Sequence, residues 1–574
     1  MKPLLFLLGA VIFLVGCTKD NDILYPDPFF PNQETFKSPL FIEVFDANGL
    51  RIPDAKILLG ESEAYTDVNG LLYLNDATVG QSAYLTVEKE GFFLASRRFY
   101  PEKGKAQYLK IILLADSRIA FFNSSDGAIL PVEDHATVKF PQGGYVRGNG
   151  DAYEGIVVIS AKSISADDPD LSFKMPGDLV GQNDAGQFGA LGSLGMIAVE
   201  MKTPEGEEIK FEKGVEAILE MIIPSSMADK APSSVPLWYF DVHDGIWKQE
   251  GTAERVGDRY KGSVSHFSFW NCDAWFETVS WGASFSYEDG SPASQVKVCI
   301  TIENLGATNC AYTDDSGEVR GMVAANEILN LIVYGKCEQE IFKSSIGPYA
   351  SEYFYGPVAV IDQNEISHVS GYAVDCQLKS LVNGYVKIST GKATYFVVPD
   401  AKTGLFDAIV SSCSNGVVGL LAYDPQKGNF SKPLSIPFSP VIHTDTLFTC
   451  GTLEEYAIIE IEGFQVPLFY DSLRMGIDGH HTYFGAEIRG ETEFGFSFSG
   501  TSVGHYISSD KTTLRGYIDS IQIRNAGPLS ITIEKYGKVG EYITGTFQGK
   551  VVTSEFDFVP KYDMKGSFSV LREE

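Results

Sequence analysis

The segment LFIEVFDANGLRIPDAKILLG (residues 40–60), with YTDVNGLLYL (65–74) shortly after it, decides the fold of this chain. Hydrophobic and polar residues alternate in both runs, which is the period of a half-buried β-strand. The turns at Asn48-Gly49 and at TDVNG (66–70) interrupt the alternation, because glycine adopts positive φ and aspartate hydrogen-bonds to the turn backbone. The pattern predicts short strands joined by tight turns.

The same scheme occurs twice more along the chain. WGASFSYEDGSPASQVKVCI and AYTDDSGEVRGMV fall within residues 281–376, and NGYVKISTGKATYFVVPDAKTGLFDAIV (383–410) follows the scheme more loosely. The pair Asp67/Gly70 corresponds to Asp314/Gly317, and Asp400/Gly404 is one residue longer. Structural Ca²⁺ at these turns is an alternative, but each turn clusters too few oxygen ligands. We therefore interpret the motif as a turn and expect no cofactor.

The pattern G…PDA.I.LG….TD.NG…L resembles the carboxypeptidase regulatory-like domain, which is a seven-stranded transthyretin-like β-sandwich. The resemblance implies non-catalytic accessory modules at 38–116 and 279–378 and a divergent third one at 379–454. Together with two further regions, it predicts an all-β fold of β-sandwich modules in series, which would form a rod.

Residues 117–278 form another predicted β-sandwich. The runs VPLWYFDVHDGIWKQEG (235–251) and SHFSFWNCD (265–273) resemble the extracellular module of cartilage intermediate layer proteins and of bacterial surface lipoproteins. The resemblance implies extracellular architecture and no reaction.

All five tryptophans lie in this region or just after it. Flat rings can stack on sugars, so Trp238, Trp247 and Trp275 are candidates for a glycan-binding platform. The alternative is a β-sandwich core, since alternate rings on a strand point inward.

The C-terminal region 455–574 is predicted to be a further β-sandwich. The segments YITGTFQGKVV and YDMKGSFSVLREE each contain a glycine followed two residues later by a phenylalanine, Gly545/Phe547 and Gly566/Phe568. We expect the two segments to be adjacent antiparallel strands. His480 and His481 lack a third ligand at suitable spacing, and we expect a solvated loop. The three aspartates of SADDPD (165–170) are a second candidate for Ca²⁺, with a solvated turn as the alternative.

The cysteines have a pattern of their own. Cys337 to Cys376 and Cys413 to Cys450 span similar distances in two repeats, which predicts these two pairs as disulfides. Cys299 and Cys310 flank a turn and are predicted to cross-link a hairpin. Cys272 is then unpaired, and buried free thiols at all these positions are the alternative.

The N-terminus indicates where the protein resides. An apolar run from Leu4 to Val15 ends in Leu-Val-Gly-Cys17, which resembles the lipobox of bacterial lipoproteins. The resemblance implies a signal peptide at 1–16, lipidation of Cys17 and a membrane anchor. Residues 17–37 are rich in Asp, Asn and Pro and read as a tether. The residues directly after Cys17 resemble the surface-export signals of Bacteroidetes outer-membrane lipoproteins.

Charge and motifs exclude several function classes. The formal net charge of −30 argues against nucleic acid as a partner. No GxSxG, HExxH, P-loop or dinucleotide fingerprint is present, so no catalytic residue is predicted.

Three functional hypotheses follow. The first is a non-enzymatic, lipid-anchored envelope or cell-surface protein for adhesion or scaffolding, with an unidentified protein or glycan ligand. The second is a glycan-binding lipoprotein of an outer-membrane uptake complex. The third is an enzyme whose site is built from scattered loop residues.

Overall fold

The structure is a computed structural model that describes residues 33–572, with gaps at 363, 382, 391–392, 414–415, 432–433, 453–455, 462–467, 471–472, 479, 488–492, 509–512, 519–520, 526, 540 and 553–560. The described chain is almost entirely β-structure, as the alternating sequence pattern predicts. None of its helices is long and apolar enough to cross a membrane.

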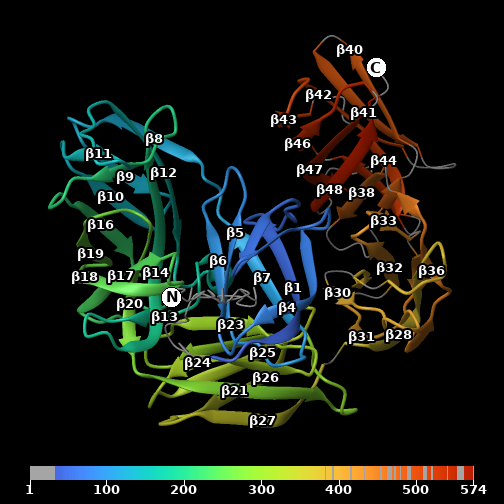
Figure 1. Cartoon of the computed structure of the whole chain (residues 1–574), viewed down its shortest axis with the longest axis horizontal. Coiled ribbons are helices and arrows are strands. Elements are labelled where there is room, and N and C mark those ends of the chain that lie inside the picture. Colours follow the sequence, from blue (N-terminus) through green and yellow to red (C-terminus); the bar gives the residue numbers. More distant parts are fainter. Residues whose placement is uncertain are drawn as a thin grey trace, which may run out of the picture.

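The first module pairs a three-stranded sheet, β4-β1-β7, with a four-stranded sheet, β3-β2-β5-β6 (Figure 1). In the first sheet β1 runs antiparallel to β4 and parallel to β7. Alternate residues of both sheets, such as Ile42 and Leu85, are fully buried between them. The strands are β1 (Phe36–Asp46), β2 (Lys56–Leu59), β3 (Ser62–Tyr65), β4 (Leu71–Val79), β5 (Ala83–Glu88), β6 (Ala95–Phe99) and β7 (Gln107–Leu113).

The third module repeats this order strand for strand, with sheets β24-β21-β27 and β23-β22-β25-β26. Again its first strand runs antiparallel to the fourth strand and parallel to the last. Its strands are β21 (Thr278–Tyr287), β22 (Lys297–Ile302), β23 (Thr308–Tyr312), β24 (Glu318–Ala324), β25 (Leu329–Tyr334), β26 (Glu340–Ile346) and β27 (Tyr353–Val360).

The fourth module keeps the same topology although its sequence match is the loosest. Its sheets are β31-β28-β35, with β36 also on β28, and β30-β29-β32-β33-β37, with β34 on β32. Its strands are β28 (Ile366–Asp375), β29 (Tyr385–Thr390), β30 (Ala393–Val397), β31 (Leu405–Ser411), β32 (Val417–Asp424), β33 (Asn429–Phe430), β34 (Leu434–Pro437), β35 (Val441–His443), β36 (Leu447–Thr449) and β37 (Gly451–Thr452).

The boundary predicted between 378 and 379 is wrong, because β28 belongs to the fourth module. It pairs with β31, β35 and β36 of that module. The turn after β28 also matches the turn after β1. Asp375 accepts hydrogen bonds from the backbone N–H groups two and four residues ahead, as Asp46 does after β1. The strand that was assigned to the end of one repeat therefore begins the next.

The recurring aspartates are turn formers, as predicted. One carboxylate oxygen of Asp67 accepts the N–H groups of Asn69 and Leu71, at 2.8 and 3.1 Å. Asp314 accepts the equivalent N–H groups of Ser316 and Glu318. Asp400, in the longer turn, accepts those of Lys402 and Thr403. These bonds satisfy backbone donors that the turn would otherwise leave unpaired.

The second module is built around one continuous sheet with the order β8-β12-β14-β20-β17-β18-β19-β16-β10-β9, joined by β13. A small pair, β11-β15, accompanies it, and a four-residue helix, α1 (Leu171–Lys174), faces the third module. The strands are β8 (Arg118–Asn123), β9 (Ala128–Val132), β10 (Ala136–Phe140), β11 (Tyr145–Arg147), β12 (Ile156–Ile164), β13 (Val180–Gln182), β14 (Phe188–Lys202), β15 (Ile209–Phe211), β16 (Ala217–Ile222), β17 (Ser234–Asp241), β18 (Ile246–Val256), β19 (Arg259–Val264) and β20 (Phe269–Phe276).

The fifth module contains the two adjacent antiparallel strands that the paired glycine and phenylalanine positions predicted. In β47 and β48, Gly545 lies opposite Phe568 and Phe547 opposite Gly566. The ring of Phe568 occupies the space where a side chain on Gly545 would lie. The strands are β38 (Tyr456–Ile461), β39 (Leu468–Tyr470), β40 (Leu473–Asp478), β41 (His481–Glu487), β42 (Glu493–Ser499), β43 (Gly504–Ile507), β44 (Thr513–Ile518), β45 (Ile521–Asn525), β46 (Ser530–Tyr536), β47 (Tyr542–Val552) and β48 (Lys561–Leu571).

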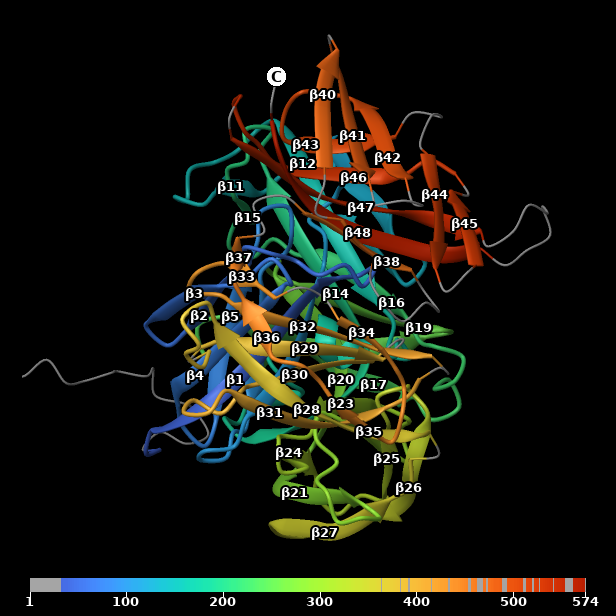
Figure 2. The ribbon, with the colours of Figure 1, turned by 90° about the vertical axis from the view of Figure 1, so that its right-hand side faces the viewer.

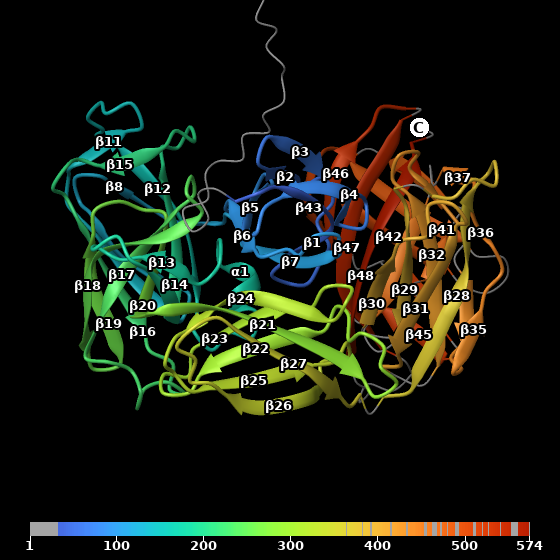
Figure 3. The same ribbon diagram turned by 60° about the horizontal axis from the view of Figure 1, so that its bottom comes forward.

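The five modules do not form the rod that the sequence predicted. The first module lies in the middle, between the second on one side and the fourth and fifth on the other, with the third beneath it (Figures 1 and 3). The fifth module lies above the fourth, at the opposite end from the third (Figure 2). Apolar clusters join the first module to the second and to the fourth. The rod prediction failed because contacts between modules are non-local and leave no periodic pattern in the sequence.

Candidate functional site

The candidate site is formed by the junctions between modules, where buried polar groups gather. Nowhere among the described residues do three or more His, Cys, Asp or Glu side chains come together as ligands for a metal ion.

Arg98 of β6 fixes the junction between the first and second modules. Its side chain is only 3% exposed. The guanidinium donates to the backbone carbonyls of Asp244 (2.9 Å) and Gly245 (3.3 Å) in the turn between β17 and β18, and to Ser82 Oγ (2.7 Å). The ring of Tyr84 covers Gly245, so that any side chain at this position would collide with it. A buried guanidinium with several carbonyl partners holds the two modules in one orientation.

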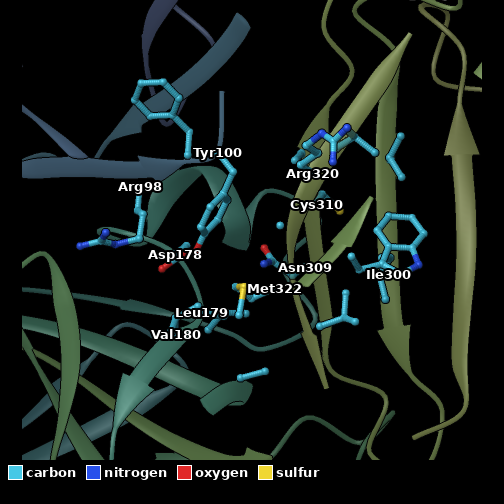
Figure 4. Close-up of a pocket in the computed structure, with 18 of the residues that line it drawn as sticks. Arg98, Tyr100, Asp178, Leu179, Val180, Ile300, Asn309, Cys310, Arg320 and Met322 are labelled. Carbon is cyan, nitrogen blue, oxygen red and sulfur yellow. The ribbon is translucent and has the colours of Figure 1, made fainter. Parts of the chain in front are cut away.

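A cavity of about 150 Å³ lies beside this junction, between the first, second and third modules. Figure 4 shows Tyr100 reaching toward Asp178, while Arg98 points away from the cavity. The Tyr100 hydroxyl donates to Asp178 Oδ2 at 2.6 Å, and Arg97, next to Arg98 on β6, is 8% exposed. Burial lowers the pKa of Arg97 to about 10, and the nearby Asp178 opposes this shift. The volume of this cavity is smaller than the roughly 300–1,000 Å³ of ligand pockets, so we interpret it as a packing gap between modules.

The junction between the first and fourth modules depends on Tyr385, which is 1% exposed. Its hydroxyl donates to Asp67 Oδ2 at 2.7 Å and accepts a hydrogen bond from Asn69 Nδ2 at 2.8 Å. Both partners belong to the turn that the sequence singled out. Around this contact Phe41 and Phe396 bury their rings against each other, with centroids 6.5 Å apart.

This junction predicts a pH dependence of stability. Burial raises the pKa of Asp67 to about 6, against an ordinary value of 3.8, and the Tyr385 hydroxyl opposes the shift. A carboxyl group with a raised pKa binds its proton more tightly in the folded state. Its contribution to stability is therefore complete below about pH 3.8 and is lost as the pH rises through about 6.

The control for this effect is Asp67→Asn, which keeps the oxygen that accepts the two turn N–H groups and does not titrate. Relative to this variant, the wild-type free energy of unfolding should increase by about 2 kcal/mol between pH 7 and pH 4. Urea unfolding at both pH values measures the difference, and a difference that is constant with pH would contradict the assignment.

Of the two interpretations of the tryptophans, core and glycan-binding platform, the structure supports core for Trp238 and Trp247. Trp238 and Trp247 are 0% exposed. Their indole N–H groups donate to the backbone carbonyls of Asp273 and Asp178. Trp275 is half-buried and packs against the same cluster. Both rings belong to the apolar cluster that joins the second module to the first, so the neighbouring module covers them.

The disulfides follow the predicted pattern only in part. Cys299 is bonded to Cys310 across the β22-β23 hairpin, as predicted, and Cys272 is free and buried. The predicted pairs Cys337–Cys376 and Cys413–Cys450 are wrong. The structure joins Cys337 to Cys413 and Cys376 to Cys450, with Cα atoms 5.1 and 5.0 Å apart.

The physical reason for this correction is the shifted module boundary. Cys376 follows β28, the first strand of the fourth module, and Cys450 follows β36, which runs parallel to β28. That disulfide therefore joins the ends of two paired strands, β28 and β36, within one module. Cys337 follows β25 of the third module and Cys413 follows β31 of the fourth, so the second disulfide links two modules.

The remaining candidates from the sequence are accounted for locally. His480 is exposed, and His481 begins β41, where its ring nitrogen lies 3.1 Å from Ser499 Oγ. In the 165–170 loop, Asp168 pairs with Lys174 at 2.7 Å and Asp170 with Lys110 at 3.3 Å. These carboxylates are engaged by lysines, which leaves the calcium interpretation without a ligand set. Cys17 lies outside the described residues.

Sequence reasoning missed Arg98 and Tyr385. Two consecutive arginines inside the strand-like run ASRRFY (95–100) were a usable signal, because a half-buried strand must place one of them inward. Tyr385 carries no such signal, since aromatic residues at strand starts are ordinary core residues.

Comparison with known proteins gives one sequence relative. Human cartilage intermediate layer protein 2 is 23% identical over 213 residues, which are 35% of this chain and 18% of that protein. The chain therefore spans less than a fifth of that relative. A scan against protein-family profiles finds no match.

Solved structures with similarity include pilus subunits. The streptococcal ancillary pilin is 10% identical, with 39% of this chain and 95% of that chain covered and a TM-score of 0.13. The major pilin subunit of Bacillus cereus is 8% identical, with 72% and 99% covered and a TM-score of 0.12. Scores this low carry no conclusion about function.

Proposed function

We propose that this chain is a non-enzymatic surface protein of a bacterial envelope, lipid-anchored at Cys17, whose modules act as one rigid adhesion or scaffolding body. The observation that carries the proposal is the locking of the modules to one another. Buried hydrogen bonds from Arg98 and Tyr385 and the Cys337–Cys413 disulfide connect four of the five modules. A body locked in this way presents a fixed outer surface.

The disulfides support an extracytoplasmic location. Disulfides persist in oxidising compartments and are rare in the cytosol. The lipobox-like run before Cys17 supports lipid attachment, and the relative named for a cartilage layer is consistent with an extracellular setting. We place the protein in the outer membrane, exposed at the cell surface.

The second candidate function is glycan binding. The buried tryptophans no longer support it. A different feature, a large cavity with a cationic lining, favours a particular class of saccharide.

Replacing Cys17 with alanine tests the anchor. We expect Cys17→Ala to abolish incorporation of labelled palmitate and to move the protein from the membrane fraction to the soluble one, because single acyl chains add about 0.8 kcal/mol per buried CH₂ and several are needed for stable attachment. Thr18→Ala, next to the cysteine, is the matched control and should remain in the membrane. Retention of Cys17→Ala in membranes would show that another feature anchors the chain.

The surface location is tested on intact cells. An impermeant protease should cleave the wild-type modules, and cells lacking the chain should adhere less to matrix-coated surfaces. Wild-type protein should restore adhesion, whereas Cys17→Ala should not. Protection from the protease until lysis would contradict surface exposure.

A further inference from the structure

A large cavity lies where the modules meet. Its volume is about 1,010 Å³, and its walls come from all five modules, with Asp170 as the contribution of the second. The fifth module closes one side, where Lys565 donates to the backbone carbonyl of Gly49 at 2.9 Å. A cavity of this size is at the upper end of the roughly 300–1,000 Å³ range of small-molecule sites.

The lining is cationic in a chain whose formal net charge is −30. Four carboxylates also line the cavity, Glu43, Asp170, Glu338 and Asp563. The cations outnumber them and are Arg51, Lys110, Lys297, Lys336, Lys550 and Lys565. The excess of positive charge here runs against the charge of the molecule as a whole.

Three of the carboxylates are already engaged. Glu43 pairs with Arg51 at 2.8 Å, Asp170 with Lys110 at 3.3 Å and Asp563 with Lys550 at 2.6 Å. Within these pairs the charges neutralise one another, and the cations that matter for a ligand are Lys297 and Lys336.

Lys297 and Lys336 have no ion-pair partner in the part of the chain that the structure describes. Lys297 Nζ lies 4.9 Å from the ring centroid of Tyr334. Lys336 Nζ lies 5.2 Å from that of Tyr395 and donates to Gln295 Oε1 at 3.2 Å. Rings and an amide hold these ammonium groups in place without neutralising them.

The two lysines come from the same end of one sheet. Lys297 of β22 lies directly opposite Tyr334 of β25, and Lys336 follows two residues later. Desolvation in the cavity lowers the pKa of Lys336 to about 8, and Glu43 opposes this shift. The other groups that face it are the hydroxyl-bearing rings Tyr312 and Tyr395. An anion placed beside Lys336 would stabilise its charged form.

The rest of the lining indicates which anion fits. Uncharged hydrogen-bonding side chains line the same cavity, and they are Asn48, Gln295, Ser389, Thr394, Ser530 and Gln548. Amides and hydroxyls both donate and accept, which suits a ligand that carries many hydroxyl groups. We propose that this cavity binds an acidic saccharide, with its carboxylate or sulfate against Lys297 and Lys336 and its hydroxyls against the amides and hydroxyls. The proposal stands independently of the lipid anchor.

The experiment is calorimetric titration of the full mature chain in detergent with tri-galacturonate. Neutral galactotriose is the uncharged control, a sulfated galactotriose distinguishes sulfate from carboxylate, and tri-glutamate represents an acidic peptide. We expect tri-galacturonate or the sulfated sugar to bind, the neutral sugar to bind at least tenfold more weakly, and affinity to fall as the pH rises through about 8.

Lys297→Met and Lys336→Met should each weaken binding at least tenfold. Lys336→Met should also remove most of the loss of affinity near pH 8. Both variants remove a cation that lacks an ion pair, so thermal unfolding should show that they fold. Lys343→Met, an exposed lysine on β26 of the same module, is the matched control and should bind like the wild type.

Three results would overturn the proposal. The first is no heat with either acidic sugar, and the second is equal binding by the lysine variants and the wild type. The third is binding of tri-glutamate as tight as that of the sugars, which would assign the cavity to acidic peptides.

Discussion

Tyr385→Ala is expected to lower the free energy of unfolding by about 3–5 kcal/mol, the range for truncating a large buried aromatic ring. The ring is 1% exposed and packs edge-on against Phe396 and Tyr423. Its removal leaves a cavity at the contact between the first and fourth modules. Chemical denaturation of the full chain measures the loss.

Tyr385→Phe separates the hydroxyl from the ring. Without the hydroxyl, Asp67 Oδ2 loses its donor and the buried Asn69 Nδ2 loses its acceptor. Leaving buried groups unsatisfied costs about 1–3 kcal/mol, so the variant should fall between wild type and Tyr385→Ala. Tyr372→Phe is the control, because Tyr372 lies on β28 with 47% of its surface exposed. A Tyr385→Phe variant as stable as the control would show that the hydroxyl does not hold the modules together.

The location of this junction shows what sequence patterns can and cannot reveal. The turn around Asp67 was predictable because its hydrogen bonds reach only two and four residues along the chain. The same local logic predicted the Cys299–Cys310 hairpin and the Gly545/Phe568 pairing. Tyr385 reaches Asp67 across 318 positions, and no local period encodes such a contact.

The same difference between local and non-local contacts explains why the environment of the tryptophans was left open and why the predicted rod was wrong. Alternation along β17 correctly indicated that Trp238 points inward, but whether the inward side was a core or a platform depended on what covered it. The pattern within one module does not distinguish a face that another module covers from a face that is free surface. The structure shows that the first module is covered on several sides, and the cationic cavity exists only where the modules meet.

Removal of the long-range disulfides is the second change that we expect to lower stability strongly. Cys337–Cys413 closes a loop of 76 positions and Cys376–Cys450 one of 74. Loop-closure entropy of that size corresponds to about 4 kcal/mol of stability, against about 3 kcal/mol for the 11-position loop of Cys299–Cys310. Replacing both cysteines of a long loop with alanine should therefore destabilise more than the same change in the hairpin, which serves as the comparison. Denaturant unfolding of the three double variants measures the order.

Removing each of the two long-range disulfides should also change the unfolding curve in a different way. Cys337–Cys413 joins the third module to the fourth, so its removal should uncouple them and split one unfolding transition into two. Cys376–Cys450 lies within the fourth module, and its removal should lower a single transition. Non-reducing peptide mapping provides the direct check, with Cys337 peptides linked to Cys413 and Cys376 peptides linked to Cys450. Peptides that link Cys337 to Cys376 would instead restore the pairing expected from spacing and would place β28 outside the fourth module.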